Sequence, residues 1–209
     1  MHLRIFIAIS LSLTILLSAF PVQSTVVSPR AIQAYNQLID VVHLNNNANN
    51  KYIADTLQVI DKHSFDGIRA PIYGIIAKLE TNKGNLIQAN IYLEKAISAL
   101  SKTANHSYKI DSYNHISWVY FNRGDYASAI YYVQKMADYA FEHQHQRGQA
   151  IALNRLGQSY IELGLSGLAF SPLESALDIS RENQFKNTEL LALLYLANAG
   201  LKSHKLSAK

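Results

Sequence analysis

The chain has 209 residues, a formal net charge of +4 and no cysteine. This length fits one domain or a short repeat array. With 49% hydrophobic and 16% charged residues the chain can bury a core, which excludes wholesale disorder. The absence of cysteine excludes disulfide scaffolds, thiol catalysis and thiolate zinc sites.

Residues 1–24 have the pattern of a secretory signal peptide. Arg4 precedes an apolar run from Ile5 to Leu17, and Val22-Gln23-Ser24 offers compact residues for cleavage. Even when extended to Phe20 the run has 16 residues, short of the roughly 20 that cross a bilayer. We therefore expect a cleaved leader, transient contact with the membrane through it, and export to a bacterial periplasm, with full secretion as the alternative.

Three glycines, Gly84, Gly124 and Gly164, recur at an interval of 40 residues. Such a repeat in a chain of this length predicts a stacked array of small units. Helix-starting residues follow the glycines, at Asn85, Asp125 and Ser166. The apolar columns with the same interval are Ala89, Ala129 and Ala169; Leu93, Val133 and Leu173; and Ala96, Met136 and Ala176.

Each unit reads as two helices joined by a tight turn at the glycine. Tyr113, Ile116, Ser117 and Tyr120 have the spacing of one stripe on a first helix, and Ala129, Val133 and Met136 that of a stripe on a second. Small residues such as Gly157 and Ala169 let the two helices approach closely. Because no pair can bury its stripes alone, we expect the pairs to stack.

The run Leu156-Gly157, Tyr160, Gly164, Ala169, Leu173 and Ala176 resembles the tetratricopeptide repeat (TPR) pattern, and the segment 120–129 repeats its centre. The resemblance implies an all-α fold, a right-handed superhelix of antiparallel helix pairs, or TPR-like α-solenoid. HEAT-like repeats are a less suitable alternative because they lack the Gly/Ala column. Sel1-like repeats want a Gly-x-Gly turn that is absent here.

The repeat divides the chain into four parts after the leader is set aside. The parts are a degenerate helix pair at 29–66, a TPR array at 70–202 with units near 70–109, 110–149 and 150–189, a final helix at 190–202, and a tail at 203–209. The usual TPR period is 34 residues. Six extra residues per unit predict longer second helices or longer turns between units, as at Glu142 to Gly148.

The stripe opposite the core on the first helices is polar with an aromatic centre. The resemblance implies that the first helices line a concave groove, the surface that TPR proteins commonly use for peptides. Amides can donate to and accept from an extended backbone, and Trp118, the one tryptophan, supplies an apolar anchor with Phe121. The predicted groove residues are Lys78, Asn82, Asn114, Trp118, Phe121, Asn122, Asn154, Gln158 and Asn198.

Two alternatives stand beside this groove. In the first alternative, the amides are only solvated and Trp118 packs against a neighbouring unit. The second alternative is the function of a TPR subclass that clamps terminal carboxylates with a set of Lys, Asn and Arg residues. Lys78 and Arg155 lie on the relevant helices, but His115 and Ile151 occupy positions where Asn and Lys are expected, so we do not expect that clamp.

The last helix is apolar nearly all round, from Leu190 to Leu201. A repeat array normally ends in a cap with a polar outer face. We therefore predict that Leu191, Leu194 and Leu201 form a contact with a second copy or a protein partner. The alternative is that this helix folds back and hides its second face within the chain.

These features predict a non-enzymatic exported adaptor or scaffold that binds a protein or peptide. No catalytic constellation or cofactor motif is present, and His143 and His145 beside Glu142 read as solvated side chains rather than metal ligands. Loss of the leader leaves a charge of +3 without a basic block, which argues against nucleic acid. The alternative function is a periplasmic sensory module that binds a peptide or small ligand and signals through a partner such as a diguanylate cyclase or histidine kinase.

Overall fold

The computed structural model describes residues 27–44, 49–63 and 66–207, and within these ranges the regular structure is entirely helical. The predicted leader lies outside the described residues. The elements in chain order are α1 (Pro29–Leu44), α2 (Asn49–His63), α3 (Asp66–Asn82), α4 (Leu86–Ala99), the short 3-10 helix η1 (Leu100–Lys102), α5 (His106–Asn122), α6 (Tyr126–Glu142), α7 (Gln146–Glu162), α8 (Ser166–Glu182) and α9 (Lys186–Ser207).

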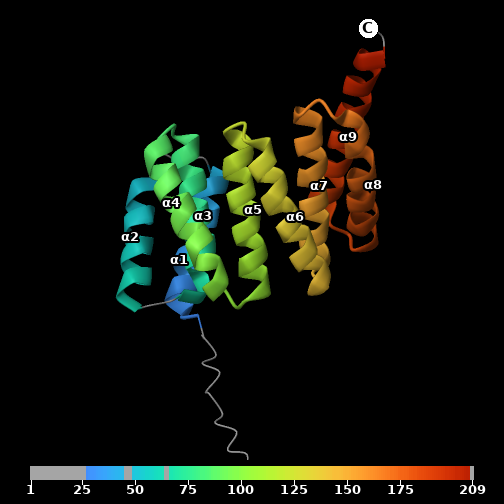
Figure 1. The fold of residues 1–209 in the computed structure, drawn as a ribbon. Coiled ribbons are helices and arrows are strands. Elements are labelled where there is room, and N and C mark those ends of the chain that lie inside the picture. The colour runs from blue at the N-terminus through green and yellow to red at the C-terminus, as the bar shows by residue number, and fades with distance from the viewer. Residues whose placement is uncertain (1–26, 45–48, 64–65, 208–209) are drawn as a thin grey trace, which may run out of the picture.

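The helices stand side by side as a row of antiparallel hairpins, from α1 and α2 at one end to α9 at the other (Figure 1). The pairs α3–α4, α5–α6 and α7–α8 pack along their lengths, and α9 packs on α8 and α7. The all-α array of stacked helix pairs predicted from the repeat is therefore confirmed. The leading pair α1–α2 packs on α3.

The 40-residue period comes from equal helices and short turns. Helices α3, α5, α6, α7 and α8 have 17 residues each, and α4 with η1 spans the same length. From α3 to α9, with η1 counted as the end of α4, three residues separate successive helices, so the additional length lies in both helices of a unit and not in the turns between units. The first helices begin at Asp66, His106, Gln146 and Lys186, about four residues before the boundaries placed from the sequence.

Five turns between the described helices reverse the chain through a left-handed residue, whereas the turn from η1 to α5 has none. Within units this residue is the recurring glycine, with φ of 78° at Gly84 and 76° at Gly124 and Gly164. Between units it is glutamine, with φ of 52° at Gln144 and 59° at Gln184. In each of these five turns the N–H of the residue after the left-handed one donates to the carbonyl five residues back, the bond that closes a helix C-terminus.

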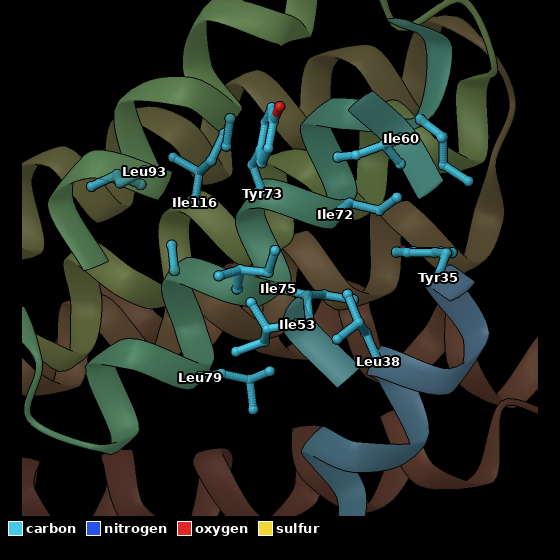
Figure 2. Close-up of a cluster of buried hydrophobic side chains, with 14 of the residues drawn as sticks. Tyr35, Leu38, Ile53, Ile60, Ile72, Tyr73, Ile75, Leu79, Leu93 and Ile116 are labelled. Atoms are coloured by element: carbon cyan, nitrogen blue, oxygen red, sulfur yellow. The ribbon is translucent and has the colours of Figure 1, made fainter. Parts of the chain in front are cut away.

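The predicted stripes form the core. Ile116 and Ser117 of α5 are buried, as are Ala129, Val133 and Met136 of α6. The largest cluster joins α1, α2, α3, α4 and α5 through closely packed aliphatic side chains, among them Leu38, Ile60 and Ile72 (Figure 2). The alanine column at 89, 129 and 169 is fully buried, which confirms that it faces the partner helix.

The leading pair is joined to the array by a buried polar contact. The Tyr35 hydroxyl of α1 donates to Asp111 Oδ2 of α5 over 3.0 Å, and the Tyr35 ring lies edge-on to Tyr108 at 5.5 Å. Burial raises the pKa of the Asp111 carboxyl, and the hydrogen bond from Tyr35 opposes that rise. The contact uses the one carboxylate of α5.

The C-terminal helix α9 is the longest element, at 22 residues, and runs past the ends of α7 and α8 (Figure 1). It begins at Lys186, before the predicted start at 190. Among the described helices none combines the length and apolarity needed to cross a bilayer.

Candidate partner-binding face

Lysine and tryptophan from two successive first helices meet on the predicted face. Lys78 of α3 places its ammonium nitrogen 4.7 Å from the centre of the Trp118 ring of α5. Both residues are half-buried, and Trp118 also packs against the large core cluster. Trp118 therefore packs against neighbouring side chains, as the alternative reading of the sequence predicted. In addition, a cation lies over one face of its ring.

The next first helix adds an arginine to the same place. Arg155 of α7 donates from Nε to Asn114 Oδ1 of α5 over 2.5 Å, and Tyr195 of α9 is near enough to act on its charge. Four first helices therefore contribute to one region. We call Lys78, Asn114, His115, Trp118 and Arg155 the central cluster.

The charges of the central cluster act strongly on one another. Burial, and then the charge of Arg155, lower the pKa of Lys78 to about 8. Burial, and then the charges of Lys78 and Arg155, lower the pKa of His115 to about 3. Burial also lowers the pKa of Arg155. At neutral pH the cluster thus holds two cations beside a neutral imidazole.

Other predicted groove residues are bonded within α5 or to its neighbour. Phe121 is half-buried and lies edge-on to Tyr126 of α6, with ring centres 5.3 Å apart. Asn122 is exposed and its amide donates to the Trp118 carbonyl over 2.9 Å, one turn earlier in the same helix. These two residues continue the face from Trp118 toward the end of α5.

Asn154 lies inside the protein. It is 3% exposed, and its amide donates to the Thr188 carbonyl of α9 over 2.9 Å, so its donor is used to join α7 to α9. Asn82 is exposed, whereas Gln158 and Asn198 are half-buried and follow Trp118 in the 40-residue register. Of the nine predicted residues, Lys78, Asn114 and Trp118 belong to the central cluster, where Lys78 lies against Trp118 and Asn114 bonds to Arg155.

Sequence reasoning named Arg155 and His115 only as parts of an incomplete clamp. A signal for them was present, because Ile75, His115, Arg155 and Tyr195 form a column of the same 40-residue interval, one residue after the column of Asn114 and Asn154. The column therefore locates the cluster once the stacking is known.

The histidines near the turn after α6 have structural partners. The ring of His143 lies against that of His106, with centres 3.9 Å apart and planes tilted by 32°, and His106 Nδ1 lies 2.8 Å from the Tyr139 hydroxyl. His145 Nδ1 accepts the Gly148 N–H over 3.0 Å and so caps α7. Across the described ranges no three side chains of metal-ligating type gather as a site.

A separate hollow of about 430 Å³ lies between α3 and α4. Its cations have partners on the protein, because Arg69 pairs with Asp61 over 3.7 Å and Lys95 lies 5.1 Å from the centre of the Tyr92 ring. We therefore place the candidate site at the central cluster.

The predicted association residues on α9 are exposed. Leu191 is 42%, Leu194 59% and Leu201 67% exposed, and Leu190 and Leu193 beside them are exposed as well. The alternative in which α9 hides its second face within the chain does not hold for these side chains.

Comparison with solved structures identifies the class of fold. The chain is similar to a Podosopora anserina structure of nearly identical TPR-like repeats, described as a kinesin light chain. The TM-score is 0.64 at 14% identity, over 84% of this chain and 88% of that chain. No protein-family model and no curated protein sequence matches this chain. The fold is therefore a TPR-like α-solenoid.

Proposed function

We propose that this protein is a non-enzymatic, exported scaffold that binds an extended segment of a partner protein on the face formed by α3, α5, α7 and α9. The observation that carries the proposal is the central cluster, in which Lys78 of α3 lies over the Trp118 ring of α5 and Arg155 of α7 bonds to Asn114 of α5. A half-buried aromatic ring beside polar side chains suits a peptide, because the ring can bury an apolar side chain while the polar groups bond to the backbone.

Further polar residues extend this face in both directions. Asn122 lies one turn beyond Trp118, and Gln158 and Asn198 repeat the Trp118 position on α7 and α9. A bound segment of several residues would cross all three helices. Repetition at one register position supports an elongated ligand over a compact one.

Selection from a displayed library of random peptides, using the purified protein as bait, tests this function. We expect selected peptides to lose roughly tenfold or more in affinity for Trp118→Ala, because buried aromatic residues dominate such interfaces. A second variant, Gln158→Lys, changes the face without removing core packing. Tyr131→Ala is the matched control, since Tyr131 is an aromatic residue 54% exposed on α6.

Melting temperatures of all variants separate a lost contact from a lost fold. Equal affinity of every selected peptide for the wild type, Trp118→Ala and Gln158→Lys would contradict the proposed face. Equal loss in Tyr131→Ala would do the same, because that residue lies on a second helix.

Export is the second part of the proposal and rests on the charged and apolar pattern of residues 1–24. Expression of the full chain in a bacterium, followed by fractionation and intact-mass measurement, tests it. We expect a periplasmic product that begins at Thr25. A cytoplasmic product of full mass would contradict export.

We also propose that α9 associates with a second copy of this chain. In the array each second helix covers the preceding first helix, but α9 is covered by α8 and α7 on one side and leaves Leu191, Leu194 and Leu201 exposed on the other. The same apolar face on a second copy provides a self-complementary cover, as twofold dimers require.

A further inference from the structure

One side of α9 is exposed at positions that are buried on the first helix before it. The exposed residues lie four, three and four residues apart, the spacing of one stripe along a helix, and they are Leu190, Leu194, Ala197 and Leu201. The positions 40 residues earlier on α7 are all buried, and they are Ala150, Asn154, Gly157 and Ile161. We call the four exposed residues the α9 stripe. It has the register of a covered surface, but no described helix covers it.

The covering of α7 shows which kind of element fits this register. The antiparallel second helix α8 packs on α7, and its Leu173 side chain lies directly against Gly157. Each second helix has a large, buried apolar residue at this place, because Leu93, Val133 and Leu173 form one column. Ala197 is the α9 counterpart of Gly157 and is also small. The α9 stripe therefore fits an antiparallel helix with a leucine opposite Ala197.

A second α9 has that leucine in the right place. The spacing of four, three and four residues is the same in both directions, so an antiparallel copy matches the stripe along its whole length. Leu194 of each copy then lies opposite Ala197 of the other, and Leu190 lies opposite Leu201. The twofold axis crosses near the middle of α9 (Lys186–Ser207), so the part that runs past α7 and α8 also takes part (Figure 1).

The helix at the other end of the array, α1, does not provide such a partner. Its exposed residues between positions 30 and 40 are all polar, and they are Arg30, Gln33, Asn36, Gln37 and Asp40. Head-to-tail stacking of α9 on α1 would place these side chains against leucines, which is unfavourable. A pair that closes through two α9 helices buries apolar surface on both sides.

We propose that two copies pair through α9, so that each α9 takes the place of a second helix for the other copy. This inference rests on the self-association proposed above and specifies its geometry. Because each copy supplies the second helix of the other, the faces formed by the first helices point to opposite sides of the pair. One pair would thus hold two partner segments and act as a bridge between them.

Disulfide trapping tests the geometry directly, because the sequence contains no cysteine. Leu194→Cys and Ala197→Cys proteins of different tagged mass are mixed in reductant, left to exchange subunits and oxidised. We expect the mixed pair to exceed each like pair by about fivefold or more, because only the mixed pair places the two sulfurs opposite each other. Leu168→Cys, at a residue 58% exposed on α8, is the control and should link with neither.

A second variant tests the need for a small residue in the α9 stripe. Ala197→Phe should weaken pairing by about tenfold or more in sedimentation, because the ring fills the place of the opposing leucine. Ala197 is exposed in the single chain, so the fold should tolerate the change. Ala127→Phe, at an exposed alanine of α6, is the matched control and should pair like the wild type. Circular dichroism checks that both variants are folded.

The outcomes separate this pairing from the other proposals. A wild type that stays monomeric at several hundred micromolar would overturn the pairing and the self-association together. Like pairs as frequent as the mixed pair, or unchanged pairing in Ala197→Phe, would overturn the geometry alone. If the pair forms as described and no library peptide binds, the pairing stands and the peptide-binding function falls. If peptides bind a monomer, the peptide-binding face stands and the pairing falls.

Discussion

Gly157 of α7 faces Leu173 of α8 so closely that a Cβ built on Gly157 would lie 2.4 Å from Leu173 Cγ. This contact confirms that a small residue at position 157 lets the two helices of a unit approach. Both residues belong to the repeated columns that indicated the fold.

Gly157→Ala should destabilise the protein by about 1–3 kcal/mol, because the added methyl overlaps a fully buried leucine. Denaturant unfolding measures the change. Gly167→Ala is the matched control, since a Cβ on Gly167 meets nothing within 4 Å and alanine favours a helix. An unfolding free energy for Gly157→Ala equal to that of the wild type would contradict the close packing.

Gln144→Gly should stabilise the turn between α6 and α7 by roughly 0.5–1 kcal/mol. Gln144 has a φ of 52°, where a side chain is unfavourable and glycine is not. Gln134→Gly, at an exposed position inside α6, should lower stability by about 1 kcal/mol. Thermal unfolding distinguishes the two, and a lower melting temperature for Gln144→Gly would contradict the turn geometry.

Lys78→Met should raise the free energy of unfolding at pH 7 by about 1–2 kcal/mol, after allowance for partial solvent exposure and the lost ring contact. The pKa of folded Lys78 is lowered to about 8 from an ordinary 10.5, so its charge costs stability at pH 7. Between pH 8 and 10.5 the unfolded chain binds more protons there, and Lys78 adds a rise in stability with pH.

Unfolding curves for wild type and Lys78→Met at pH 7 and pH 9.5 measure this difference. The gain from the substitution should shrink at the higher pH. A constant difference would show that the Lys78 pKa is not lowered.

His115 should make the protein sensitive to acid. The pKa of folded His115 is lowered to about 3 from an ordinary 6.5. As pH falls below 6.5, His115 binds a proton in the unfolded chain but not in the folded chain. The free energy of unfolding therefore falls by roughly 1 kcal/mol per pH unit, down to about pH 3. Comparison of wild type with His115→Gln between pH 7 and pH 4 isolates this effect, and parallel stability curves would contradict it.

Leu194→Glu should convert an associated protein to a monomer. Burial of two leucines contributes roughly 3–6 kcal/mol, and a glutamate on the α9 face opposes it. Sedimentation at increasing concentration measures association, with Leu168→Glu as control because Leu168 is 58% exposed on α8. A wild type that stays monomeric at several hundred micromolar, with unchanged solubility and melting temperature in Leu194→Glu, would contradict the self-association.

The amino-acid sequence alone determined the repeat. Glycine at 84, 124 and 164 and alanine at 89, 129 and 169 recur because each unit needs the same left-handed turn and the same close helix contact. Such requirements are local and repeat with the chain, so periodicity is enough to identify helices, pairs and core stripes. It did not reveal Gln144 and Gln184 as left-handed residues, because glutamine has no special preference for that conformation.

Only the tertiary structure decided which side chains meet across units. Lys78 and Arg155 are 77 residues apart, yet the charge of Arg155 acts on Lys78 because α3 and α7 both contact α5. The amide of Asn154, on the same stripe, turns inward to Thr188. The packing of α3 against α5 sets these positions, and it depends on contacts such as Gly74 with His115. A linear repeat specifies each unit, but the rotation from one unit to the next is a sum of many side-chain contacts that no single period encodes.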